Sequence, residues 1–107
     1  MNLVEEHKEV ISELCQQHKV AYLYVFGSVL TAKFRPDSDI DFVVKFGEID
    51  PYDYFDNYMD LKEALEKLLQ RPVDLLEEQA INNPILRKSI NQNKKLIYGR
   101  SDKKMAA

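Results

Sequence analysis

The sequence contains no tryptophan, only three glycines and only one cysteine among its 107 residues. A single cysteine, Cys15, cannot form an intrachain disulfide, and with only His7 and His18 available as partners a zinc site is not expected. We therefore expect Cys15 to behave as a small apolar residue on a helix face.

Long apolar runs are also missing, since none approaches the roughly 20 residues needed to cross a bilayer. The N-terminus lacks the basic start and apolar stretch of a signal peptide, so we expect a cytoplasmic protein with no membrane association. Nor is there an excess of positive charge: the net charge is -3, and no basic stripe is evident. Broad binding to nucleic acid is therefore not expected.

What is present is typical of a small globular domain, with 45% apolar and 31% charged residues. A chain of this length usually forms one domain with one core. We predict a single domain over residues 1–100, followed by a flexible tail over residues 101–107.

Hydrophobic periodicity predicts the helices. Apolar residues recur at helical spacing over residues 2–18 and, most clearly, over residues 54–68. A third helix is expected to begin at Asn83-Pro84, because proline is favoured at the first helical position. A short helix is expected over residues 28–33, and residues 47–53 are predicted to form a loop.

β-Branched and aromatic residues predict strands over residues 20–26, 40–46 and 73–76, with a last strand or a set of core anchors over residues 96–98. Helices and strands alternate along the chain. This order predicts an α/β (α+β) fold in which helices pack on a small mixed β-sheet.

Two motifs stand out: one lies where the first predicted strand ends, and the other lies where the second begins. Gly27-Ser28 ends the first strand, and after ten residues Asp39-Ile40-Asp41 begins the second. Glycine permits a sharp turn and close approach of phosphate, while a serine at a helix start offers an N–H and a hydroxyl. Asp39 and Asp41 are expected to point to one face of the strand, where they can bind a hard cation such as Mg²⁺.

A third acid, Asp74, lies between apolar residues in the third predicted strand. If this strand pairs with the second, Asp74 joins Asp39 and Asp41, and the three carboxylates can hold two metal ions for phosphoryl or nucleotidyl transfer. One of them can also accept the proton of an attacking hydroxyl. Taken alone, Asp74 would equally fit a surface acid on an edge strand.

Lys33 and Arg35 lie between the two motifs and are candidate phosphate contacts, although simple solvent exposure fits them equally well. A calcium loop counted from Asp37 is an alternative for the acids, with Glu48 at its twelfth position. Phe42 opposes it, because the sixth position of such a loop requires glycine.

The spacing of Gly27-Ser28 from Asp39-Ile40-Asp41, with Asp74 in a later Val-Asp-Leu strand, resembles the minimal nucleotidyltransferases of the DNA polymerase β superfamily. The resemblance covers nearly the whole chain and implies that superfamily's nucleotidyltransferase fold. It implies that Asp39 and Asp41 bind Mg²⁺, that Gly27 and Ser28 hold the phosphates of a nucleotide, and that Asp74 completes the metal site and the base.

Small members of this family resemble the antitoxins of toxin-antitoxin pairs, whose partner is an all-helical HEPN-type ribonuclease. The resemblance therefore implies transfer of AMP from ATP to a tyrosine of such a toxin. The chain departs from the family in one loop, where Leu30, Thr31 and Ala32 replace the Ala-Arg-Gly of many members.

That departure motivates a second hypothesis, a partner-binding module that neutralises a toxin without catalysis. A third is nucleotide transfer to a small molecule or to an RNA end. An aromatic group at Tyr52, Tyr54, Phe55 and Tyr58 is a candidate surface for a partner or a homodimer, although such a stripe more often belongs to the core.

Overall fold

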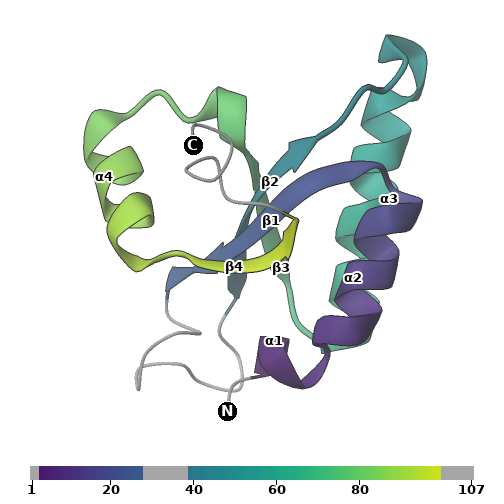
Figure 1. The fold of residues 1–107 in the computed structure, drawn as a ribbon, viewed down its shortest axis with the longest axis horizontal. Coiled ribbons are helices and arrows are strands. Elements are labelled where there is room, and N and C mark those ends of the chain that lie inside the picture. The colour runs from purple at the N-terminus through teal and green to yellow at the C-terminus, as the bar shows by residue number, and fades with distance from the viewer. Residues whose placement is uncertain (1–2, 28–38, 100–107) are drawn as a thin grey trace.

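The computed structural model describes residues 3–27 and 39–99, which form a four-stranded sheet in the order β3-β2-β1-β4 (Figure 1). The strands are β1 (Val20–Phe26), β2 (Ile40–Phe46), β3 (Val73–Glu77) and β4 (Lys95–Gly99). β1 pairs antiparallel with β2 and β4, whereas β2 and β3 run parallel. The sheet is therefore mixed, as predicted.

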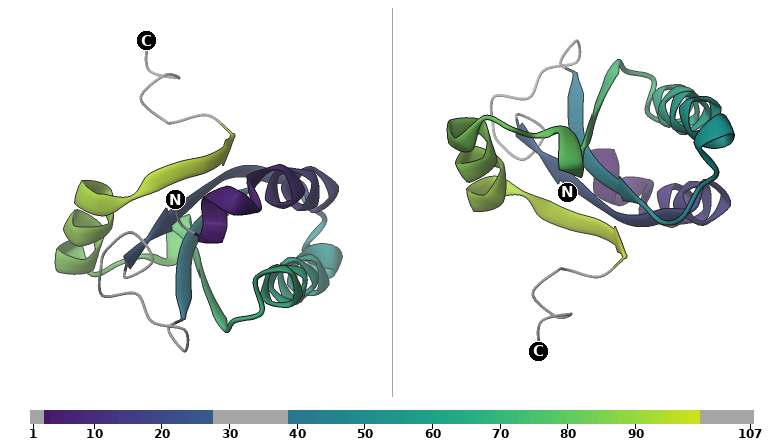
Figure 2. Two further views of the ribbon diagram at one scale, coloured as in Figure 1. Left: turned by 90° about the horizontal axis from the view of Figure 1, so that it is seen from below. Right: turned by 90° about the horizontal axis from the view of Figure 1, so that it is seen from above.

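Helices cover the two faces of this sheet unequally. In Figure 2, α2 and α3 lie together on one side of the sheet and α4 lies on the other. The helices are α1 (Leu3–Glu6), α2 (Lys8–Gln17), α3 (Pro51–Leu69) and α4 (Pro84–Asn93), with a 3₁₀ turn η2 (Glu78–Ala80) after β3. One face is thus largely covered and the other is more open.

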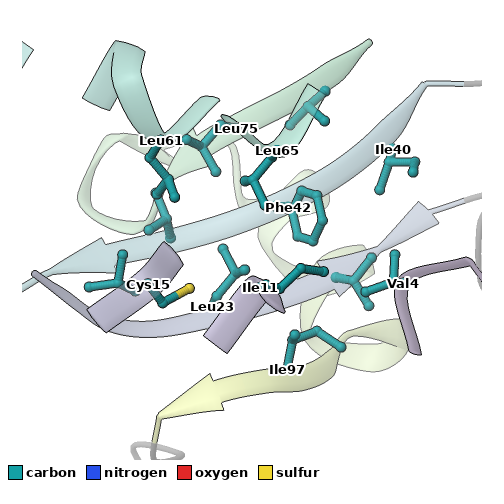
Figure 3. Close-up of a cluster of buried hydrophobic side chains, with 14 of the residues drawn as sticks. Val4, Ile11, Cys15, Leu23, Ile40, Phe42, Leu61, Leu65, Leu75 and Ile97 are labelled. Carbon is teal, nitrogen blue, oxygen red and sulfur yellow. The ribbon is translucent and has the colours of Figure 1, made fainter. Parts of the chain in front are cut away.

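The main core lies between the sheet and the α2–α3 layer (Figure 3). Phe42 of β2 is fully buried at its centre, and Leu61 and Leu65 of α3 reach it from the helix layer. Cys15 of α2 is fully buried in the same core as a free thiol, as predicted. Burial raises the pKa of this thiol to about 12, so it is an apolar filler at neutral pH.

A smaller cluster lies on the opposite face, where Tyr22, Tyr24 and Val43 meet Ile90 of α4. Polar contacts also hold α4 in place. Arg87 pairs with the carboxylate of Glu78 and donates to the Glu78 carbonyl oxygen at 3.0 Å. α4 is therefore attached at one end of this face, and the remainder of the face is formed by side chains of the strands.

Two predicted helix boundaries were wrong. The helix predicted over residues 2–18 is interrupted at His7, where the backbone turns: the His7 N–H donates to the Val4 carbonyl at 3.1 Å. The helix predicted over residues 54–68, which is α3, begins at Pro51, inside the predicted loop. It does so because the Asp50 side chain accepts the Tyr52 N–H and proline suits the first turn.

The outer edge of β3 is partly closed by side chains of α3. The Val73 N–H donates to the Glu66 carboxylate at 3.0 Å, and the Tyr58 hydroxyl donates to the Leu75 carbonyl at 2.5 Å. Edge strands expose unpaired backbone groups that invite further strand pairing. α3 satisfies two of these groups and so limits pairing along β3.

The short helix predicted over residues 28–33 and the tail over 101–107 lie outside the described residues. The calcium-loop alternative is excluded, because residues 40–46 form a central strand of the sheet rather than an ion-binding loop. Among the residues that the structure describes, no helix is long and apolar enough to cross a membrane.

Candidate functional site

The candidate site lies on the more open face of the sheet, at one end of the two central strands. Side chains alternate along β2, so Ile40 and Phe42 enter the main core while Asp41 between them points to the other face. The same alternation buries Val73 and Leu75 in β3 and leaves Asp74 exposed. Apolar packing on one face thus presents two carboxylates on the other.

Strand pairing brings the predicted acids together. Asp41 is directly opposite Asp74 in the parallel pairing of β2 with β3, and directly opposite Phe26 in the antiparallel pairing with β1. Gly27 follows Phe26, so it lies next to Asp41 as well. Three segments that are distant in sequence therefore meet at one end of the sheet.

Gly27 is required there for two reasons. Its φ is +84°, in the left-handed region that favours glycine. A Cβ atom at this position would also overlap Oδ2 of Asp41, so any side chain would displace that carboxylate. The backbone at Gly27 therefore approaches the acid closely and leaves no side chain between the turn and Asp41.

The electrostatics of the site are dominated by Asp41. Its pKa is raised from 3.8 to about 6, first because the group is partly buried and then because the charges of Asp74 and Asp39 lie nearby. Both causes disfavour the ionised form. A cation next to Asp41 would instead favour the ionised form, so the site is one in which positive charge is favoured.

Asp39 is exposed and lies one residue before β2, as the predicted strand bounds of 40–46 place it. Over residues 3–27 and 39–99, no three acidic, histidine or cysteine side chains are grouped closely enough to form a complete metal cage. Mg²⁺ commonly uses one or two carboxylates, with waters and substrate phosphates as the remaining ligands. The oxygen donors of Asp41 and Asp74 fit that pattern.

Ser28, Lys33 and Arg35, the other predicted nucleotide contacts, lie outside the described residues, as do Leu30, Thr31 and Ala32. Sequence motifs do not single out Lys94, whose Nζ lies 4.2 Å from the ring centroid of Tyr24. This cation–π contact lies on the acid-bearing face, because Tyr24 pairs with Val43, two residues after Asp41. Its partners are 70 positions apart, so no local pattern marks it.

Comparison with known proteins identifies relatives over nearly the whole chain. Residues 8–103 match the family described as "Polymerase beta, Nucleotidyltransferase". A Methanocaldococcus jannaschii protein, provisionally named a protein adenylyltransferase, is 36% identical over 96 residues, which cover 90% of each chain.

Solved structures agree with this match. One provisionally described as a minimal nucleotidyltransferase superposes with a TM-score of 0.72 at 33% identity, covering 89% of this chain and 95% of the other. A chain from the complex of a tri-AMPylated Shewanella oneidensis HEPN toxin with an MNT antitoxin gives a TM-score of 0.64 at 20% identity, covering 95% and 77%. The latter likeness is one of fold.

Proposed function

Because this chain belongs to the polymerase β nucleotidyltransferase family, we propose that it transfers AMP from ATP to a hydroxyl group of a partner protein. One observation carries the proposal: Asp41 and Asp74 are paired across parallel strands beside the Gly27 turn, on the open face of the sheet. The adenylyl group and the protein acceptor are suggested by the provisional name of the Methanocaldococcus relative.

The reaction forms one bond and breaks one. The oxygen of the acceptor hydroxyl attacks the α-phosphorus of ATP, the bond from that phosphorus to the bridging oxygen of the β-phosphate breaks, and pyrophosphate leaves. The hydroxyl proton passes to a carboxylate. We assign this role to Asp74, because it is exposed at the edge strand, where a large acceptor can approach.

Asp39 and Asp41 are the proposed Mg²⁺ ligands, with Asp74 completing the set, and Gly27 and Ser28 are the proposed phosphate contacts. Bound Mg²⁺ would neutralise the charge of the triphosphate and of the departing pyrophosphate. The protein's own contribution is positional. Gly27 admits phosphate next to Asp41, and the β2–β3 pairing fixes the proton acceptor opposite it.

We further propose that the acceptor is a HEPN-type toxin and that the chain is its antitoxin. The fold likeness to a chain of the tri-AMPylated HEPN toxin complex supports this partner class. Since ATP would be the donor, the proposal places the protein in the cytoplasm. Residues 1–100 would act as one nucleotidyltransferase domain in this role.

Incubation with α-³²P-labelled ATP, Mg²⁺ and the HEPN-type protein encoded next to this chain tests the proposal. We expect label on the partner with the wild-type protein and a loss of at least about a hundredfold with Asp41→Asn or Asp74→Asn. Glu13→Gln is the control, because it removes one negative charge from an exposed position of α2. An unlabelled partner, or equal labelling by Asp41→Asn, would contradict the proposal.

The same variants separate catalysis from simple binding. If the Asp39→Asn/Asp41→Asn double variant still silenced the toxin while titration of the wild-type protein with ATP showed no binding, the non-catalytic binding module would be the correct function. If the label appeared on an RNA end or a small molecule instead of the partner, the acceptor would be that molecule and not a protein.

A further inference from the structure

The beginning of α3 presents aromatic side chains that the core does not absorb. Tyr54 and Tyr58 are half-buried and pack edge-to-face against Phe46, with ring centroids 5.4 and 6.5 Å away. Tyr52 and Phe55 are instead 95% and 69% exposed. The aromatic group identified in the sequence is thus divided between core anchors and a surface.

A pocket of about 380 Å³ lies between this helix and the edge of the sheet, lined by Tyr54, Phe55, Tyr58 and Glu77. Its inner walls are fixed by hydrogen bonds: the Tyr58 hydroxyl donates to Leu75, and Gln79 donates to the Tyr54 hydroxyl at 3.3 Å. A pocket with fixed aromatic walls can receive a side chain at small entropic cost. We call this pocket, together with exposed Tyr52, the aromatic groove.

The aromatic groove borders an acidic surface on the outer face of α3. Residues 48–60 contain five acids and no lysine, arginine or histidine, whereas the whole chain has a net charge of only -3. Exposed Asp56 and Asp60 lie beyond Phe55 on the outer face of α3, and Glu77 lines the groove on the β3 side. Lys62, next to Tyr58, is paired with Glu66. The groove therefore combines apolar walls with negative charge at Glu77 and along the adjoining outer face of α3.

The aromatic groove is also close to the candidate active site. Glu77 follows Asp74 by three positions in β3, about 10 Å along the strand, so its side chain lies on the α3 face of the sheet and that of Asp74 on the open face. Burial and then the charge of Glu77 raise the pKa of Tyr58, the charge of Lys62 opposes this rise, and the charge of Asp74 adds a smaller increase. A protein held in the groove would thus lie within reach of the carboxylates, around the β3 edge.

We infer that the aromatic groove docks the acceptor protein through a segment that presents an apolar side chain flanked by lysines or arginines. This inference rests on the proposed function, since it assigns the groove to the protein that receives AMP. The apolar anchor fills the pocket, and the flanking cations face Asp56, Asp60 and Glu77. Aromatic pockets surrounded by charge are typical positions for the few residues that dominate binding energy.

Two other occupants fit the structure less well. Addition of a strand along β3 is opposed by α3, because Glu66 and Tyr58 already bind two groups of that edge. A second copy of this chain could offer exposed Ile85 and Lys88 of α4. Such a contact joins two different patches, so it forms a closed pair only if both patches of each copy meet at once, and otherwise an open chain.

Calorimetric binding of the HEPN-type protein encoded next to this chain, without nucleotide, tests the inference separately from catalysis. We expect Phe55→Ala to raise Kd about tenfold or more, and Asp56→Lys to raise Kd about tenfold at low salt and less at high salt. Both positions are exposed, so the fold should tolerate the changes. ATP binding should stay at the wild-type value in both variants.

Matched controls come from other helices. Ile85→Ala truncates an exposed apolar residue of α4, and Glu13→Lys reverses an exposed charge of α2; neither should change Kd by more than about twofold. Equal weakening by Ile85→Ala would overturn the inference. So would a wild-type protein that self-associates and becomes monomeric on Phe55→Ala, since the occupant would then be a second copy.

The two proposals fail differently. If the wild-type protein bound its partner through the groove but did not label it, the docking inference would stand and the proposed transfer would not. If the partner were labelled and Phe55→Ala left both Kd and the KM for the partner unchanged, the transfer would stand and the docking inference would be wrong.

Discussion

At the scale of single residues, the site places like charges where they destabilise the empty protein. Asp41 is partly buried and lies opposite Asp74, with Asp39 two positions before it. A carboxylate in such surroundings holds its proton more tightly in the folded state than in the unfolded chain. Residues arranged for binding rather than for stability often show this conflict.

The first prediction follows from the pKa of Asp41, which rises from 3.8 to about 6 on folding. Between these values the folded state binds more protons than the unfolded state, so the contribution of this group to stability falls as pH rises from about 4 to about 6. In Mg²⁺-free buffer, Asp41→Asn should therefore gain stability relative to wild type across this window and remain more stable above it.

Urea denaturation of both proteins at a series of pH values measures this difference. Glu13→Gln serves again as the control, since Glu13 is exposed on α2 and its removal should give a difference from wild type that does not follow the same pH profile. A pH-independent difference between wild type and Asp41→Asn would show that the charge of Asp41 does not oppose folding.

At the scale of secondary-structure elements, α3 both covers the core and protects the edge of β3. Its Glu66 carboxylate accepts the Val73 N–H and also pairs with Lys62 at 3.3 Å. The Val73 hydrogen bond is the main reason that the pKa of Glu66 is lowered. The Glu66 side chain thus supplies the hydrogen-bond acceptor that a further strand would otherwise supply to Val73.

We therefore expect Glu66→Ala to leave the Val73 amide accessible to water. Its hydrogen exchange, followed by NMR, should become severalfold faster, and the free energy of unfolding should fall by about 1 kcal/mol. Glu63→Ala, at an exposed position of the same helix, should change neither. Unchanged protection of Val73 in Glu66→Ala would show that this carboxylate does not close the edge.

The sequence predicted β1 and β2 with the bounds that the structure has, and β3 to within one residue, because buried strands carry dense apolar runs. It also predicted that Asp74 would meet Asp41 if the second and third strands paired, and this is confirmed. The helix break at His7 was not predictable from periodicity, which continues through it. The early start of α3 was signalled by Asp50-Pro51 but obscured by the polar composition of that segment.

At the scale of the whole molecule, α2 and α3 cover one face of the sheet and α4 lies on the other (Figure 2). α2 buries Ile11 and Cys15 in the main core, and α3 buries three leucines there. By contrast, Ile90 is the buried residue of α4. α4 depends in addition on the pairing of Arg87 with Glu78. Local opening should therefore begin at α4.

Native-state hydrogen exchange checks this expectation. Amides in the second half of α4 should exchange at lower opening free energies than amides around Leu61 and Leu65 of α3, and Arg87→Ala should accelerate α4 exchange while leaving α3 unchanged. Equal opening free energies in both helices would mean that the two faces unfold as one cooperative unit.

The pairing of Asp41 with Asp74 has a consequence for the sheet itself. β3 is held in the sheet by its parallel pairing with β2, and that pairing brings the two carboxylates together. A ligand that neutralises them binds only when β3 is in place, so by mass action it also retains the strand. Occupancy of the site and attachment of β3 are therefore coupled: bound substrate stabilises the paired strand, and detachment of the strand weakens substrate binding.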